Sequence, residues 1–103
     1  MPKIYIAGKI TGDENYKNKF EKAERLLDRL GYIVLSPAIL PEGMTTQDYM
    51  RICFAMIDTA DIVAFLEDYE SSPGAMLEYQ YCGYVGKPMM LYRQVVEGGG
   101  APV

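Results

Sequence analysis

Residues 61–66, Asp-Ile-Val-Ala-Phe-Leu, are followed after a short acidic segment by residues 71–78, Ser-Ser-Pro-Gly-Ala-Met-Leu-Glu. The first stretch is apolar almost throughout, as strands buried in a parallel sheet are. The second has a serine suited to capping a helix and a proline suited to the first helical position. A helix that begins at the carboxyl end of a central strand directs free backbone N–H groups into the ligand crevice of an α/β sheet. The two stretches therefore predict an α/β fold and a candidate site.

Hydrophobic patterning and turn residues define the other elements. The expected strands cover residues 3–7, 32–35, 61–66 and 88–92, and the expected helices cover residues 16–30, 46–59 and 73–85. Asn15, Thr45 and Ser72 are the expected N-cap residues of these helices. A compact strand–helix–strand unit joins parallel strands through a right-handed crossover. We expect a three-layer α/β sandwich on a parallel sheet with strand order 2-1-3-4.

The chain of 103 residues is long enough for one domain, which we place at residues 1–93. The glycine-rich end has no periodic pattern, so residues 94–103 are expected to form a flexible tail. The helix over residues 46–59 is apolar on nearly every side, which indicates burial on two sides. One side can pack on the sheet, and a second copy of the chain is the simplest cover for the other. We therefore predict a homodimer or a larger homo-oligomer.

The composition argues against several classes of partner. The net charge is −4 and the ten basic residues form no stripe, which argues against nucleic acid. No apolar run approaches the length of a membrane span, and no targeting segment precedes the first strand, so we expect a cytoplasmic protein. Cys53 and Cys82 are expected to be buried, reduced thiols. Histidine is absent, which makes a zinc site unfavourable, and we expect neither a metal nor a cofactor.

Three features of the sequence should meet at the carboxyl ends of the first and third strands. The loop Gly8–Gly12 offers backbone N–H groups, the next helix offers its first turn, and Glu78 offers a carboxylate about one turn further on. A phosphate held at the helix start would place the sugar of a nucleotide near Glu78, where a carboxylate can attack C1′. The candidate ligand-binding residues are Gly8, Lys9, Ile10, Thr11, Ser72, Gly74 and Ala75.

Each of these residues also has a purely structural interpretation. A glutamate within a helix, such as Glu78, is usually a solvated surface residue, and Ser72 at a helix start is often only a cap. Lys9 alone is an ordinary exposed lysine, and Tyr5 in a central strand is more often part of the core than catalytic. The residue patterns leave both interpretations open.

The sequence resembles the nucleoside 2-deoxyribosyltransferase superfamily. The resemblance rests on Ile4-Tyr5-Ile6-Ala7-Gly8 with Ile10-Thr11-Gly12, on Ala60-Asp61, on Ser72-x-Gly74-Ala75-x-x-Glu78 and on Gly86-Lys87-Pro88. Within the superfamily the chain is most similar to the small DUF4406 proteins of phages and bacteria, which share the phrase Asp48-Tyr49-Met50-Arg51-Ile52-Cys53. The similarity covers residues 3 to about 92. It implies a flavodoxin-like or Rossmann-like fold and a homo-oligomer.

The resemblance also implies an activity, which is cleavage or transfer at the N-glycosidic bond of a nucleoside or nucleoside 5′-monophosphate. Glu78 aligns with the family's nucleophile and Tyr5 with a tyrosine of the nucleotide hydrolase branch, and these two are the expected catalytic residues. Ser72 and Gly74 align with residues that hold the phosphate in that branch. Active members carry a second acid on the helix before the third strand, and Cys53 stands at that position here.

Three functions are therefore compared. The first is an N-glycosidic hydrolase or transferase that uses Glu78. The second is a module that binds a nucleotide without chemistry, which the cysteine at position 53 favours. The third is a structural or protein-interaction role, which the apolar helix over residues 46–59 would serve.

Overall fold

The computed structural model describes residues 1–98. Its sheet has four parallel strands in the order β2-β1-β3-β4, which confirms the predicted order. The strands are β1 (Lys3–Ala7), β2 (Ile33–Leu35), β3 (Ile62–Phe65) and β4 (Met89–Leu91). The helices are α1 (Tyr16–Arg29), α2 (Thr46–Thr59), α3 (Pro73–Val85) and α4 (Tyr92–Glu97), with 3-10 turns over Pro37–Ile39 and Tyr69–Ser71. The predicted elements agree with the observed ones to within one or two residues.

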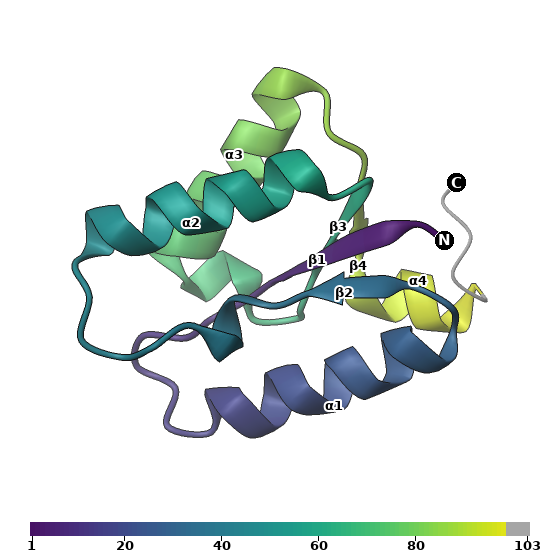
Figure 1. Cartoon of the computed structure of the whole chain (residues 1–103), viewed down its shortest axis with the longest axis horizontal. Helices are drawn as coiled ribbons and strands as arrows, with labels where there is room; N and C mark the ends of the chain where they lie inside the picture. The colour runs from purple at the N-terminus through teal and green to yellow at the C-terminus, as the bar shows by residue number, and fades with distance from the viewer. Residues whose placement is uncertain (99–103) are drawn as a thin grey trace.

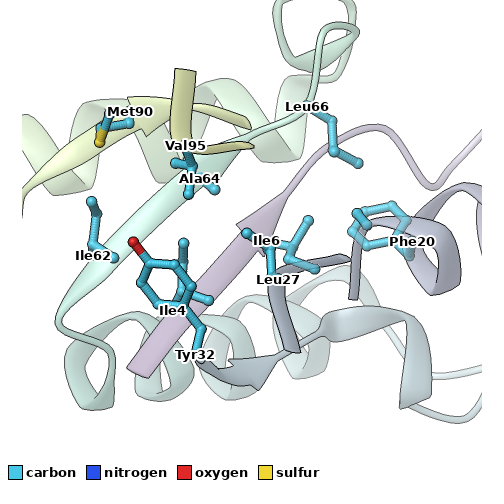
Figure 2. Close-up of a cluster of buried hydrophobic side chains, with 11 residues drawn as sticks. Ile4, Ile6, Phe20, Leu27, Tyr32, Ile62, Ala64, Leu66, Met90 and Val95 are labelled. Atoms are coloured by element: carbon cyan, nitrogen blue, oxygen red, sulfur yellow. The ribbon is translucent and has the colours of Figure 1, made fainter. Parts of the chain in front are cut away.

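Helices cover both faces of the sheet, as Figure 1 shows, with α2 and α3 on one face and α1 and α4 on the other. Because side chains alternate along a strand, β1 contributes Ile4 and Ile6 to one core and Tyr5 and Ala7 to the other. Figure 2 shows the first of these cores, in which Ile6 lies beside Phe20 and Leu27. Tyr5 therefore points toward α2 and α3, which is the side on which the candidate site lies.

The helix ends follow the expected capping chemistry with one exception. Thr45 and Asp48 form a reciprocal capping box at the start of α2, and the Ser72 hydroxyl accepts a hydrogen bond from Ala75 N–H at the start of α3. Gly86 ends α3 in the left-handed conformation, with φ of 77°. Asn15 occupies the N-cap position of α1, but its side chain accepts a bond from the Asn18 amide and caps no backbone N–H.

The chain continues past β4 into the short helix α4, which was not expected. Val95 of α4 is completely buried against the core under α1, and the Gln94 side chain accepts the N–H of Leu91. This packing corrects the expected start of the flexible tail at residue 94, because residues 94–97 are helical. The rest of the expected tail, residues 99–103, lies outside the described residues.

Helix α2 is less buried than its composition suggested. Cys53 and Ile57 are its buried residues, while Phe54 and Met56 are half-buried at the edge of the same core. Helix α3 also has an exposed apolar side, with Leu77 45%, Tyr84 93% and Val85 49% exposed. Within residues 1–98, no helix combines the length and hydropathy needed to cross a membrane. The predicted homo-oligomer stays a prediction.

Candidate functional site

The candidate site lies where β1 and β3 end side by side. The ladder between these strands continues through Leu66, whose N–H donates to Ala7 C=O at 2.8 Å. Gly8 is packed so closely on this segment that a Cβ there would lie 2.7 Å from Leu66 Cδ1. A side chain at this point would have to displace Leu66, so glycine lets the loop after β1 pack directly against the segment that leads into α3.

The central pair of the site is Tyr5 and Glu78. The Tyr5 hydroxyl donates a 2.7 Å hydrogen bond to Glu78 Oε2, and the bond is buried. Tyr5 is 0% exposed and Glu78 is 4% exposed. Glu78 occupies the inner face of α3 together with Ala75 and Cys82, since positions three and four apart share a helix face. The structure therefore brings together the two residues expected to be catalytic and excludes a solvated surface role for Glu78.

Burial controls the ionisation of this pair. It raises the pKa of Glu78 to about 7, although the Tyr5 hydrogen bond and the nearby Cys53 thiol act in the opposite direction. Burial also raises the pKa of Tyr5 well above its usual value, and the neighbouring Glu78 charge raises it further. Tyr5 therefore stays a hydrogen-bond donor at neutral pH, while Glu78 titrates in the physiological range.

Cys53 approaches the same pair from α2. Burial raises the pKa of its thiol to about 11, and the Glu78 charge acts in the same direction. A thiol of this kind is neither a strong nucleophile nor a strong acid at pH 7. Cys53 therefore stands next to the Tyr5–Glu78 pair as a buried, protonated thiol.

The first turn of α3 has fewer free donors than expected. The N–H of Ala75 donates to Ser72 Oγ at 3.2 Å, so this N–H is already used within the helix. The hydrogen of the Ser72 hydroxyl remains available, and the N–H of Gly74 has no intrahelical acceptor because of its position. A Cβ at Gly74 would lie 3.7 Å from Met50 Cε and 4.0 Å from Ser72 Oγ, which is ordinary van der Waals contact, so Gly74 is packed against these two side chains.

The loop after β1 differs from the expectation at Lys9. Its N–H donates to Asp68 Oδ1 at 3.0 Å, so a carboxylate of the protein occupies the donor that was assigned to a ligand. Among residues 1–98, the backbone N–H groups of Ile10, Thr11 and Gly12 donate to no hydrogen-bond acceptor. These amides, together with Ser72 and Gly74, form the revised set of candidate donors.

Lys19 and Asp68 were not identified from the sequence as site residues. Lys19 Nζ contacts the C=O of Lys9 at 2.7 Å, Asp13 Oδ2 at 2.6 Å and the Asp68 carboxylate. Asp68 lies 59 residues after Lys9, and only the adjacency of β1 and β3 brings them together. The acidic run at residues 67–70 was the available signal, but it did not show which carboxylate turns inward.

A separate groove of about 750 Å³ lies at the β2 edge of the sheet, between α1 and β2. Its lining includes Glu21, Arg25, Tyr32, Ile33 and Ile39, and none of the candidate site residues.

Within residues 1–98, no group of three or more His, Cys, Asp or Glu side chains is arranged to hold a metal ion.

Comparison with known proteins supports the assignment of the fold. A family model described as "Domain of unknown function (DUF4406)" matches residues 2–91. No curated protein matches the sequence.

Two solved structures are similar. One is a 2-deoxyribosyltransferase of Bacillus psychrosaccharolyticus, described as a biocatalyst for nucleoside synthesis. It is 28% identical with a TM-score of 0.67, over 86% of this chain and 70% of that one. The other is a 2-deoxyribosyltransferase of Leishmania mexicana, 19% identical with a TM-score of 0.71. That match covers 88% of this chain and 63% of the other, and it shows a shared fold.

Proposed function

The chain belongs to the DUF4406 family, and we propose that it cleaves or transfers the N-glycosidic bond of a nucleoside or nucleoside 5′-monophosphate. The observation that carries the proposal is the buried Tyr5–Glu78 pair at 2.7 Å, with Glu78 on the inner face of α3, the helix that Ser72 caps. A carboxylate in such a position can serve as a nucleophile toward a sugar carbon. The similarity to a 2-deoxyribosyltransferase at 28% identity supports the same chemistry.

The reaction follows from the arrangement of these groups. One Glu78 oxygen attacks C1′ of the sugar, the bond between C1′ and the base nitrogen breaks, and its electron pair leaves with the base. The nitrogen of the departing base then takes a proton from water. Water, or the nitrogen of a second base, attacks C1′ in the next step and releases Glu78 as a carboxylate. The Tyr5 hydroxyl holds Glu78 in place by its hydrogen bond and stays protonated throughout.

The electrostatics of Glu78 suit this role. A nucleophile must be ionised, and burial that raises the pKa to about 7 leaves Glu78 partly ionised at neutral pH. The same burial removes water that would otherwise solvate the carboxylate. The hydroxyl of Ser72 and the N–H of Gly74 would bind a 5′-phosphate at the positive end of the α3 dipole.

A base-release assay tests the proposal. The protein is incubated with deoxynucleosides, ribonucleosides and their 5′-monophosphates, and the free base is quantified by chromatography, with and without an acceptor base. Release that is lost in Glu78→Gln supports the proposal, since the amide keeps the shape but cannot attack C1′. Exchange only with an acceptor base indicates a transferase, and release without one indicates a hydrolase. Equal release by both proteins would contradict a nucleophilic Glu78.

A second candidate function is a module that binds a nucleotide without cleaving it. The raised pKa of Cys53, at about 11, favours this alternative because the thiol is a poor proton donor to the leaving base. Calorimetric binding of an intact nucleotide by both wild type and Glu78→Gln, with no base released, would support the binding module.

The exposed apolar residues of α3, Leu77, Tyr84 and Val85, are the surface we propose for contact with a second copy. Exposed apolar side chains of this size on one helix favour an interface between chains. Sedimentation equilibrium at micromolar concentration tests this proposal, and a mass equal to one chain would contradict it.

A further inference from the structure

The ammonium group of Lys19 lies at the centre of a set of contacts between two loops. It donates to Lys9 C=O at 2.7 Å and to Asp13 Oδ2 at 2.6 Å, and it pairs with Asp68. The side chains of Lys19 and Asp13 are each 25% exposed, and that of Asp68 is 30% exposed. Lys19 comes from α1, Asp13 from the loop after β1, and Asp68 from the segment before α3, so three parts of the chain meet at one cation.

Asp68 completes the connection with its second oxygen. Oδ1 accepts the N–H of Lys9 at 3.0 Å, while Oδ2 pairs with Lys19. Lys9 is therefore held on both sides of its backbone, at the N–H by Asp68 and at the C=O by Lys19. The loop cannot shift at this residue without breaking contacts to both side chains.

The next four residues form a turn whose two ends are fixed by the same cation. Asp13 N–H donates to Ile10 C=O at 3.1 Å, and Gly12 has φ of 85°, as the third residue of a type II turn does. Lys19 holds the residue before this turn through the Lys9 carbonyl and the end of the turn through the Asp13 carboxylate. The Lys19 hydrogen bond also lowers the pKa of Asp13, which keeps that carboxylate ionised.

We infer that Lys19 and Asp68 are positioning residues, which fix the Ile10–Gly12 amides as one wall of the proposed nucleotide site. Among residues 1–98 these amides bond to no acceptor, so they remain available to a ligand. Lys19 also offsets the charges of Asp13 and Asp68, which would otherwise repel an anionic ligand. The inference rests on the proposed function only for the identity of the ligand.

The first test needs no ligand. Amide hydrogen exchange of residues 9–12 is measured by NMR in the wild type, Lys19→Met, Asp68→Ala and Asp68→Asn. The asparagine keeps an acceptor for Lys9 N–H and loses the ion pair, whereas the alanine loses both. We expect exchange at Lys9 to become at least about tenfold faster in Asp68→Ala and Lys19→Met, with a smaller change in Asp68→Asn.

Lys17→Met is the matched control, since Lys17 lies on the same helix but pairs with Glu42, away from the loop after β1. It should leave exchange at residues 9–12 unchanged. The melting temperatures of all variants should stay close to the wild-type value, because partly exposed ion pairs contribute little to global stability. Unchanged exchange at Lys9 in both Asp68→Ala and Lys19→Met would overturn the inference.

The second test uses a nucleoside 5′-monophosphate that the wild type is shown to bind. In Lys19→Met we expect the Kd or KM to rise at least about tenfold, with a smaller change in kcat, and Lys19→Arg to restore part of the affinity. Faster loop exchange with unchanged affinity would overturn the assignment of the loop as a wall of the site. A wild type that binds no nucleotide would contradict the proposed function, while the exchange experiment would still test whether Lys19 and Asp68 hold the loop.

Discussion

The hydroxyl of Tyr5 on β1 donates a buried hydrogen bond of 2.7 Å to the carboxylate of Glu78 on α3, across 73 residues of sequence. The bond joins a central strand to the inner face of a helix, beside the core that α2 and α3 form on this side of the sheet. A buried carboxylate lowers the stability of the folded state, since burial disfavours its charged form. The pair therefore has consequences for stability as well as for chemistry, and both can be measured.

The first prediction concerns the pH dependence of stability. The pKa of Glu78 is about 7 in the folded protein, against 4.5 for an ordinary glutamate. Between these pH values the folded state retains a proton that the unfolded chain has lost, so the free energy of unfolding falls as the pH rises. The contribution is fully present below pH 4.5 and lost above pH 7, and it amounts to about 3 kcal/mol.

Glu78→Gln should lack this dependence and should be more stable than the wild type at pH 8. The amide oxygen can still accept the Tyr5 hydrogen bond, so the contact itself is kept. Urea denaturation of both proteins at pH 4.5, 6 and 8 provides the comparison. Parallel curves for wild type and variant across this range would show that Glu78 is not the buried, titrating group described above.

A pair of tyrosine variants separates a bonded hydroxyl from an unbonded one. Tyr5→Phe removes the donor to Glu78 and should lower stability at pH 8 by about 1–3 kcal/mol, because the buried carboxylate loses its partner. Tyr32→Phe removes a buried hydroxyl that has no hydrogen-bond partner within residues 1–98. It should be neutral or stabilising by up to about 1 kcal/mol. The same loss in both variants, measured by denaturation, would contradict the assignment of the Tyr5 bond.

Tyr5→Phe should also change the titration of Glu78. The Tyr5 hydrogen bond lowers the pKa of Glu78, so its removal should move that pKa further above 7. The acid limb of the pH–rate profile should then shift to higher pH, and a ¹³C-labelled Glu78 carboxyl should show the same shift by NMR without substrate. An unmoved titration would mean that Tyr5 does not control the ionisation of Glu78.

A pair of N-cap variants tests the phosphate-binding role of Ser72. Ser72→Ala and Thr45→Ala each remove one side-chain cap, at the starts of α3 and α2, and each should cost about 1 kcal/mol of stability. Only Ser72→Ala should weaken binding of a nucleoside 5′-monophosphate, by about tenfold or more, because the lost bond is to a charged group. Binding of the free nucleoside should change less. Equal affinity losses in the two variants would assign Ser72 a capping role alone.

Restoring an acid at position 53 tests the cause of any slow turnover. In Cys53→Asp, two carboxyl groups share a buried site, so the new one should remain protonated beside an ionised Glu78 and can donate to the leaving base. Base release should rise at least about tenfold over the wild type. Cys53→Asn supplies the same shape without a titratable proton. If the two variants release base at the same rate, general-acid assistance is not what the site lacks.

The arrangement of strands and helices could be predicted because local signals agree with the fold. Ser72 and Pro73 mark the start of α3 and Gly86 its end, and the apolar run at residues 61–66 marks a buried strand. Helix α4 could not be predicted in the same way, because its one buried residue, Val95, depends on the core under α1 for its partners. The ends of a helix can therefore be predicted from the sequence where capping residues mark them.

The site was predictable only in part. The placement of Ser72 and Glu78 followed from helix geometry, but the contact of Glu78 with Tyr5 depends on strand order and on which face of β1 the tyrosine occupies. The bond from Lys9 N–H to Asp68 could not be predicted, because the Asp68 side chain reaches the loop from a distant part of the sequence. Local sequence patterns do not show contacts between residues that are distant in sequence.

The most direct measurement of the central claim is the intact mass of the protein after incubation with a 2′-fluoro-2′-deoxynucleoside 5′-monophosphate. The fluorine destabilises the oxocarbenium-like transition states, including the one through which water releases the sugar, so a long-lived covalent sugar–enzyme ester should accumulate. A nucleophilic Glu78 should give a mass increase equal to one fluorinated sugar phosphate less one water, located at Glu78 by peptide mapping and absent in Glu78→Gln. Base release by the wild type without any adduct at Glu78, or an adduct that persists in Glu78→Gln, would contradict it.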